Sequence, residues 1–263
     1  MQASLNTSKW YDRVWAAFIF FTRLPFWRVY QPHKDAYQTV VEHWPLVGWL
    51  TGGVMAGVLY AGSLYLSYPI AVLLAIVARL LLTGALHEDG LADFFDGFGG
   101  GGTDRQRILD IMKDSRIGTY GVLSLVCYLA LLFFALASMN PDDAALIILV
   151  ADPYAKMVAG QIILMMPFAR NEQTAKSGTV YRRFSATAGV SLAVQGLLPL
   201  VVYRVFFNER IDWQMLIFLP CLTMYFLYLF IWRRLRGYTG DCCGTLFLLV
   251  ELTVYLVASY YLS

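Results

Sequence analysis

"GTLFLLVELTVYLVASYY", residues 244 to 261, decides the class of fold to which this chain belongs. The stretch contains one charged residue, Glu251, and it is long enough to cross the hydrocarbon core of a bilayer, which takes roughly 17 to 25 apolar residues per helix. The whole chain has the same character, because 59% of its 263 residues are hydrophobic and only 14% are charged. A soluble core of this size does not need so much apolar surface. The composition therefore predicts a membrane protein.

Six further apolar stretches are long enough to span a bilayer, and the second of them is the shortest and contains Arg79. Apolar residues also recur at helical spacing between Trp10 and Phe21 beside basic residues, which predicts a helix that lies in the membrane interface. We expect an all-α, polytopic integral membrane helical bundle: a single domain, residues 1–263, of about seven transmembrane helices with an N-terminal interfacial helix. The six stretches are Leu46 to Ser67, Ile70 to Leu86, Tyr120 to Ser138, Ala144 to Met166, Ala186 to Tyr203 and Trp213 to Trp232.

Two glycine pairs in the first span have the G-x-x-x-G spacing that lets membrane helices pack closely, and they are Gly48/Gly52 and Gly53/Gly57. The basic residues predict the orientation of the bundle. Most of the 20 Lys and Arg residues fall in the N-terminal segment and in the loops 87–119, 167–185 and 233–243. The positive-inside rule then makes that side cytoplasmic and leaves the C-terminus outside.

An acidic motif, "HEDGLADFFDGFGGGG", occupies residues 87 to 102. Asp89, Asp93 and Asp96 are spaced i, i+4, i+7, so on a helix they fall within an arc of roughly 60°. Like charges at this spacing repel each other, and a divalent cation relieves the repulsion. Hard carboxylate oxygens suit Mg²⁺, which takes one or two carboxylates and fills its other positions with water and phosphate oxygens. A solvated acidic helix end is the alternative interpretation.

The next segment, "TDRQRILDIMKDSRIGTYG" at residues 103 to 121, mixes acidic and basic residues. Asp110 and Asp114 are one helical turn apart, with Arg107, Lys113 and Arg116 between and beside them. Guanidinium groups bind phosphate oxygens in pairs, so the segment beside the three aspartates predicts a phosphate clamp. An ordinary solvated helix would have the same pattern.

Three more places carry charge in or beside apolar spans. Asp241, in "RGYTGDCCG" at residues 236 to 244, is either a helix cap or a site residue. Glu251 lies deep in the last span, where an ionisable residue usually faces a partner or a polar cavity. Asp152 and Lys156 are spaced i, i+4 in the fourth span, so they either neutralise each other or contribute to a site.

These motifs resemble those of the cobalamin synthase family, the adenosylcobinamide-GDP ribazoletransferases. "HEDGLADFFDGFGG", "IMKDSRIGTYG" and "GYTGDCCG" occur in this order on a matching hydropathy profile, and "FTRLP" (21–25) and "WPLVG" (44–48) also fit the family's pattern. The resemblance spans nearly the whole chain.

The resemblance implies a magnesium-dependent transfer at the bacterial cytoplasmic (inner) membrane. The ribose hydroxyl of α-ribazole, or of its 5′-phosphate, would attack the cobinamide-linked phosphorus of adenosylcobinamide-GDP, and GMP would leave. The product would be adenosylcobalamin or its 5′-phosphate. No nucleic acid is expected as a partner, and a homo-oligomer or other enzymes of the pathway could share the membrane.

The resemblance also assigns expected roles to residues. Asp89, Asp93 and Asp96 would hold Mg²⁺, and one of them or Asp114 would receive the hydroxyl proton. Lys113 and Arg116 would steady phosphate oxygens. The expected substrate-binding residues are Arg107, Asp110, Ser115, Lys156, Arg170 and Asp241.

The chain departs from the family at three places. Lys156 stands where members often carry Arg, and only one deep acid, Glu251, follows the "TGD" motif. The loop "FARNEQTAKSG", residues 168 to 178, keeps Arg170 and Glu172 but not the family's glycines.

The sequence leaves two other classes of protein open. One is a membrane transferase of the CDP-alcohol phosphotransferase or prenyltransferase kind, which also uses clustered aspartates with Mg²⁺, although its D-G-x-x-A-R motif is absent. The other is a divalent-cation transporter, which should carry acids near the middle of the membrane on several spans.

Overall fold

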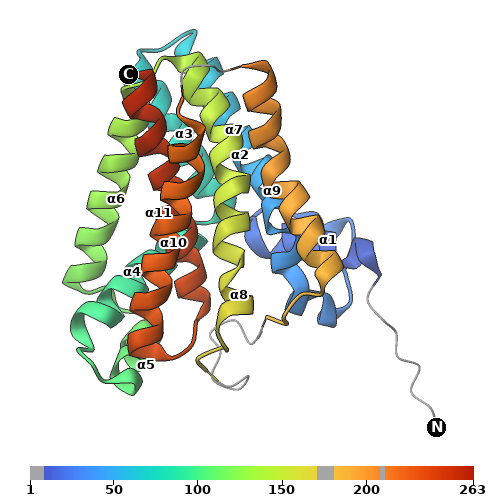
Figure 1. Ribbon diagram of the computed structural model, residues 1–263, viewed down its shortest axis with the longest axis vertical. Helices are drawn as coiled ribbons and strands as arrows, with labels where there is room; N and C mark the ends of the chain where they lie inside the picture. Colours follow the sequence, from blue (N-terminus) through green and yellow to red (C-terminus); the bar gives the residue numbers. More distant parts are fainter. Residues whose placement is uncertain (1–8, 171–180, 208–210) are drawn as a thin grey trace.

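The computed structural model describes residues 9–170, 181–207 and 211–263. Throughout these residues the chain is helical apart from connecting segments and one isolated bridge between Phe168 and Tyr238. Figure 1 shows the helices as an upright bundle, with α4 and α5 at one end and the C-terminus at the other. The elements are α1 (Trp10–Phe21), η1 (Phe26–Arg28), η2 (Lys34–His43), α2 (Trp44–Ser63), α3 (Tyr68–Thr83), α4 (Leu86–Gly100), α5 (Arg105–Lys113), α6 (Thr119–Ala137), α7 (Pro141–Gly160), α8 (Ile162–Met165), α9 (Ala186–Phe206), α10 (Trp213–Leu235) and α11 (Gly240–Leu262).

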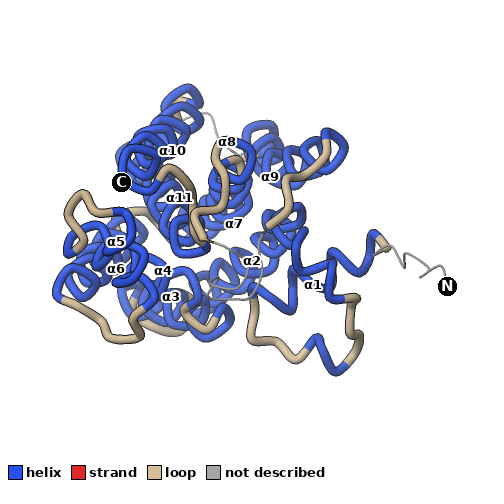
Figure 2. The backbone as a smooth tube through the Cα atoms, turned by 90° about the horizontal axis from the view of Figure 1, so that it is seen from below, coloured by secondary structure: helices blue, strands red, loops and turns tan. Residues whose placement is uncertain are grey.

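The membrane-spanning character predicted from the sequence is confirmed. Within the described ranges six helical segments are long and apolar enough to cross a membrane, and α3 with α4 makes a seventh if this bent pair counts as one span. α7 and α11 lie in the interior of the bundle, with most of their residues buried, whereas α6, α9 and α10 leave most of their surface on its outside. Figure 2, which looks along the bundle, shows α7 and α11 surrounded by the other helices. The chain is therefore a multi-pass membrane protein.

The expected span Ile70 to Leu86 ends early, because the chain turns by 89° between α3 and α4. The turn places Gly84 and Ala85 in the left-handed region, with φ values of 65° and 54°. Glycine adopts this conformation freely, whereas alanine does so at a cost. The bend directs the acidic motif, which forms α4, away from the axis of α3.

The first glycine pair of α2 packs as predicted, and the second does not. A Cβ atom on Gly48 would lie 2.9 Å from the Cα atom of Pro153 in α7, and Gly52 faces the same helix. By contrast, Gly53 and Gly57 have nothing within 4 Å of such an atom. Close contact between α2 and α7 thus depends on one face of α2 only.

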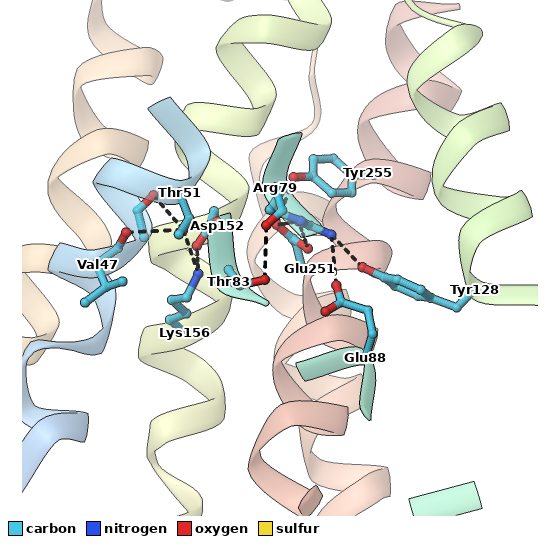
Figure 3. A network of polar contacts seen from close by, with 11 residues as sticks. Val47, Thr51, Arg79, Thr83, Glu88, Tyr128, Asp152, Lys156, Glu251 and Tyr255 are labelled. Carbon is cyan, nitrogen blue, oxygen red and sulfur yellow. Dashed lines mark hydrogen bonds and ion pairs between the residues drawn. The ribbon is translucent and has the colours of Figure 1, made fainter. Parts of the chain in front are cut away.

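The deep charges of the bundle form two separate groups (Figure 3), and in the first of them Arg79 forms ion pairs with both Glu251 and Glu88, the latter at 4.0 Å. Glu251 is fully buried and accepts two hydrogen bonds from Nη1 of Arg79, at 2.7 and 2.6 Å. Tyr255 donates to the same carboxylate at 2.9 Å, and Nη2 of Arg79 donates to the hydroxyl of Tyr128 at 2.8 Å. The prediction that Glu251 faces a partner is confirmed, and the partner comes from α3.

The second group is the ion pair between Lys156 and Asp152, which lies one turn earlier in α7. The hydroxyl of Thr51 in α2 donates to Asp152 at 2.7 Å and accepts from Lys156 at 3.1 Å. Lys156 also lies over the ring of Phe247, 4.1 Å from its centroid. The mutual neutralisation of Asp152 and Lys156 is therefore present in the structure, while a role of Lys156 in binding substrate stays a prediction.

The predicted N-terminal helix forms as α1 and packs on η2. Arg13 of α1 forms an ion pair of 3.1 Å with Glu42, and Asp12 accepts a hydrogen bond of 2.6 Å from the hydroxyl of Tyr30. At its C-terminal end, Phe21 stacks on Trp44 at the start of α2, with 5.2 Å between ring centroids. These contacts fix the end of α1 beside the bundle.

Candidate active site

A cavity of about 280 Å³ lies where α1, α2, α4 and the start of α11 meet. We call it the main cavity. Its polar lining comes from sequence segments that are far apart: Asp89 of α4, Arg170, and Thr239 and Asp241 at the start of α11. Two of the predicted site residues outside the acidic motif, Arg170 and Asp241, therefore meet Asp89 in one place.

Asp89 and Asp241 come together because α4 and α11 cross at two glycines. A Cβ atom on Gly90 would lie 3.1 Å from the Cα atom of Asp241, and one on Gly244 would lie 3.2 Å from the carbonyl oxygen of His87. Thr245 links the helices as well, since its hydroxyl donates to the carbonyls of Asp241 at 2.9 Å and Gly90 at 3.3 Å. Side chains at the two glycines would separate the helices and with them the two carboxylates.

One wall of the main cavity is aromatic. Phe21, Trp44 and His87 stack on one another, with 5.7 Å between the centroids of Trp44 and His87. Phe247 of α11 packs on this group without lining the cavity, with 4.8 Å between the ring centroids of Phe247 and His87. These residues were not among the predicted site residues, although the motifs "FTRLP" and "WPLVG" contain Phe21 and Trp44 and could have pointed to them.

Two nitrogen atoms of this wall, Nε1 of Trp44 and Nε2 of His87, are buried without a hydrogen-bond partner among the described residues. A buried polar group without a partner costs free energy, so such groups are uncommon in folded proteins. The wall thus combines flat apolar faces with two unsatisfied nitrogens.

The three aspartates of α4 have different surroundings. Asp89 is exposed at the main cavity, Asp93 is half-buried one turn further along, and Asp96 is buried. Over the ranges 9–170, 181–207 and 211–263, no three His, Cys, Asp or Glu side chains are grouped so that they could hold one metal ion together. The prediction of Mg²⁺ stays a prediction. An ion bound here would have one or two carboxylate ligands from the described residues.

Asp96 caps the N-terminus of α6. Its Oδ2 accepts a hydrogen bond of 2.6 Å from the amide of Gly118, and its Oδ1 accepts one of 2.8 Å from the amide of Gly121. A Cβ atom on Gly118 would lie 2.5 Å from the carboxylate, so the carboxylate fits only because this residue is glycine. A negative charge at a helix N-terminus satisfies free amides and complements the helix dipole. Each oxygen of Asp96 has accordingly fewer lone pairs left for a cation.

A second cavity of about 280 Å³ lies beside α5, and we call it the basic cavity. Arg170 lines both cavities. Its Nη2 donates to the carbonyl of Leu109 at 2.9 Å, while its Nε is buried without a partner in the part of the chain that the structure describes. The lining comprises Arg105, Gln106, Leu109, Asp110, Lys113, Ala169 and Arg170.

Asp114 and Arg116, predicted to act at the site, form an exposed ion pair of 2.6 Å and line neither cavity. Hydrogen bonds from the side chain and amide of Arg116 lower the pKa of Asp114 to about 2. Arg107 and Ser115 are exposed on the same segment, outside both linings. Lys156 lies inside the bundle, paired with Asp152 as described above.

Of the loop 168–178, residues 171 to 178 lie outside the described part of the chain, and Glu172 is among them. Backbone hydrogen bonds fix the first residues of the loop against the segment that precedes α11. The amide of Ala169 donates to the carbonyl of Tyr238 at 2.7 Å, and the amide of Tyr238 donates to the carbonyl of Pro167 at 3.0 Å. These bonds hold Arg170 next to the start of α11 and thus between the two cavities.

Comparison with known proteins gives a consistent result. A model of the family described as cobalamin-5-phosphate synthase matches residues 13–259. A protein of Vibrio vulnificus (strain YJ016) is 36% identical over 239 residues, which cover 90% of this chain and 91% of its own. A protein of Shewanella baltica (strain OS155) is 34% identical over 241 residues, 90% of each chain, and one of Shewanella oneidensis is 33% identical over 249 residues, 94% and 93%. All three carry the name adenosylcobinamide-GDP ribazoletransferase. No solved structure matches the chain.

Proposed function

Because the chain belongs to the cobalamin-5-phosphate synthase family, and is thus a transferase of the final stage of cobalamin nucleotide-loop assembly, we propose which substrates it joins and with which residues. The substrates are adenosylcobinamide-GDP and α-ribazole or its 5′-phosphate. GMP is released, and the product is adenosylcobalamin or its 5′-phosphate. The names of the relatives support this assignment, since they state both the GDP-linked donor and the ribazole acceptor.

The observation that carries the proposal is the convergence of Asp89, Arg170 and Asp241 on the main cavity. Phosphoryl transfer depends on positioning and on neutralising the charge of the phosphate oxygens, rather than on a covalent step that the protein must supply. Two carboxylates and a guanidinium around one cavity provide these functions. The charges buried inside the bundle, by comparison, are engaged in ion pairs with each other.

The chain's donor set fits a magnesium ion held by a small number of protein ligands. Mg²⁺ takes one or two carboxylates and completes its octahedron with water and phosphate oxygens. We assign Asp89 and Asp93, one helical turn apart on α4, as the ligands, and Asp96 as the cap of α6. When bound, the ion would neutralise charge on the diphosphate.

The residues of the chain then have distinct tasks in the transfer. The ribose hydroxyl oxygen attacks the phosphorus next to cobinamide, the bond from that phosphorus to the oxygen of GMP breaks, and GMP leaves with the electron pair. We assign the carboxylate of Asp241 as the acceptor of the hydroxyl proton. The guanidinium of Arg170 binds phosphate oxygens and stabilises the charge that they carry in the transition state.

The aromatic wall, whose rings are almost fully buried against one another, would keep water away from the reacting groups on its side of the main cavity. Aromatic rings prefer offset-stacked or edge-to-face contacts, both of which already occur among Phe21, Trp44, His87 and Phe247.

The membrane orientation belongs to the same proposal. The basic residues predict that the end of the bundle holding α4, α5 and the start of α11 is cytoplasmic, and Figure 1 shows these elements at the end opposite the C-terminus. Both cavities would then face the cytoplasm of a bacterial cell.

The proposal is tested by measuring GMP release from purified protein in detergent or liposomes. With adenosylcobinamide-GDP, an acceptor and Mg²⁺ present, we expect release that requires all three. Asp89→Asn and Asp241→Asn should reduce it by at least about 100-fold, as is usual when a group that acts in the transition state is removed. Asp142→Asn is the matched control, since Asp142 is exposed in the first turn of α7 and lines neither cavity.

Folded protein that releases no GMP with either acceptor would contradict the assignment of substrates. Equal activity in Asp89→Asn, Asp241→Asn and the control would instead contradict the assignment of the main cavity as the active site.

A further inference from the structure

The basic cavity has no task in the transfer described above, yet its lining is strongly cationic. Arg105, Lys113 and Arg170 line it together with a single carboxylate, that of Asp110. The carboxylate already accepts a hydrogen bond of 2.8 Å from the side chain of Gln106. The cavity therefore has an excess of positive charge that an anion would balance.

The two guanidinium groups are held in place by backbone carbonyls. Arg105 donates from Nε to Leu235 and from Nη2 to Ala169, both at 2.7 Å, and Arg170 donates to Leu109 at 2.9 Å. A guanidinium carries five N–H donors, so Arg105 retains three beyond these two bonds. Donors fixed in this way lose little further entropy when they bind a phosphate group.

Arg170 connects the basic cavity to the main cavity, because it lines both. Its buried Nε has no partner within the described ranges. A bound anion could accept a hydrogen bond from this N–H group and so remove the free-energy cost of leaving it unpaired. A ligand in the basic cavity would thus lie next to the group that holds the transferring phosphate. The acceptor nucleotide has this geometry, since its ribose carries the attacking hydroxyl and, at the 5′ position, a phosphate.

We propose that the basic cavity is the binding site for the 5′-phosphate of the acceptor, with Lys113, Arg105 and Arg170 as its ligands. The inference rests on the proposed function and adds to it a source of specificity. Lys113 is the residue that sets the preference for the phosphorylated acceptor over α-ribazole, because its side chain is exposed, lines the cavity and forms no hydrogen bond or ion pair with the residues that the structure describes. The phosphate of the guanylate leaving group has the same chemistry, and the experiment separates the two sources.

The experiment compares kcat/KM for α-ribazole 5′-phosphate with kcat/KM for α-ribazole. Wild-type protein should prefer the phosphorylated acceptor, and Lys113→Gln should reduce the ratio by roughly tenfold or more, as expected for one lost charge-assisted hydrogen bond. The loss should lie in KM for the phosphorylated acceptor, while the values for α-ribazole stay unchanged. Lys113→Arg keeps the charge and should restore the preference. Arg233→Gln is the matched control, because Arg233 is exposed on the last turn of α10 and lines neither cavity.

Three results would overturn the inference. An unchanged ratio in Lys113→Gln would exclude a contact with the acceptor phosphate. A raised KM for adenosylcobinamide-GDP together with weaker inhibition by GMP would assign the cavity to the guanylate phosphate. An equal fall of kcat/KM for both acceptors would assign Lys113 to the transfer itself or to the fold.

Failure of the proposed function is distinguishable from failure of this inference. If neither acceptor yields GMP, the proposed function is wrong, and calorimetric titration with α-ribazole 5′-phosphate then tests the cavity without turnover. Saturable binding to wild-type protein that weakens at least tenfold in Lys113→Gln but not in Arg233→Gln would support the inference, and equal binding to all three proteins would refute it.

Discussion

Gly90 of α4 lies against the backbone of Asp241 at the start of α11, so that a Cβ atom on Gly90 would be 3.1 Å from the Cα atom of Asp241. This contact is what lets a carboxylate from residue 89 and one from residue 241 share a cavity. The helices cannot be this close with a side chain between them. The position of Gly90 is therefore a direct test of whether the two carboxylates act together.

Replacing Gly90 by alanine should impair the transfer without unfolding the protein. A shift of about 1 Å between reacting groups can cost roughly 100-fold in rate, so we expect GMP release to fall at least tenfold. Gly53→Ala is the control, since a Cβ atom there meets nothing within 4 Å. It should keep full activity and raise the thermal midpoint slightly, because alanine favours the helix by about 0.5–1 kcal/mol. Equal activity of the two variants would show that the contact is not needed.

Asp96 and Asp89 should respond differently to the same substitution. Asp96→Asn replaces one of two accepting oxygens by an amide that cannot accept, and the loss of a helix cap costs about 0.5–2 kcal/mol. We expect a lower thermal midpoint in detergent for Asp96→Asn, with Mg²⁺ activation of the remaining activity unchanged. Asp89→Asn should keep the midpoint and lose activity. If Asp96→Asn shifted the Mg²⁺ concentration needed for half-maximal rate instead, Asp96 would be a metal ligand.

The ion pair of Arg79 with Glu251 should be essential for stability. Removing one partner of a buried pair leaves an uncompensated charge, which costs about 3–5 kcal/mol. Arg79→Met alone should therefore unfold at much lower temperature than the wild type. The double variant Arg79→Met with Glu251→Leu removes both of these charges and should recover part of the loss, since buried Glu88, 4.0 Å from Arg79 in the wild type, is still left without its partner. A double variant no more stable than the single one would show that the pair is not what stabilises these helices.

The pH dependence of the transfer should not report the titration of Asp114. Its pKa is lowered from 3.8 to about 2 by Arg116, so the carboxylate is ionised throughout an assay range of about pH 5 to 9. Because the folded pKa is the lower one, the stabilisation from this ion pair is complete above the ordinary pKa and is lost as the pH falls towards 2. Arg116→Gln should leave the pH–rate profile unchanged in that range. An acid limb that moves upward in this variant would place Asp114 in the proton transfer.

The predicted orientation can be tested by labelling intact cells with a membrane-impermeant maleimide. Ser263→Cys should react from outside, whereas Arg233→Cys should react only after the membrane is opened. Wild-type protein controls for its four native cysteines, Cys127, Cys221, Cys242 and Cys243. Labelling of Arg233→Cys but not Ser263→Cys in intact cells would reverse the orientation.

The sequence determined the class of fold and the position of nearly every span. Each transmembrane helix satisfies its own backbone hydrogen bonds and must be apolar along its length. The first and last residues of a span can therefore be predicted from the local sequence. The stretch 244–261 was predicted as a span and lies within α11. The bend at Gly84 and Ala85 was missed, because "LLTGAL", residues 81 to 86, continues the largely apolar run and only the fold shows where the helix breaks.

The tertiary structure decided which charged groups meet. A helical wheel placed Asp89, Asp93 and Asp96 on one face of α4, but it could not show that α6 presents two free amides to Asp96 while α11 brings Asp241 to Asp89. Likewise the depth of Glu251 predicted a partner without identifying Arg79. The spacing of residues fixes the direction of a side chain from its own helix, whereas its partner is set by how the helices cross, which depends on contacts between segments far apart in the sequence.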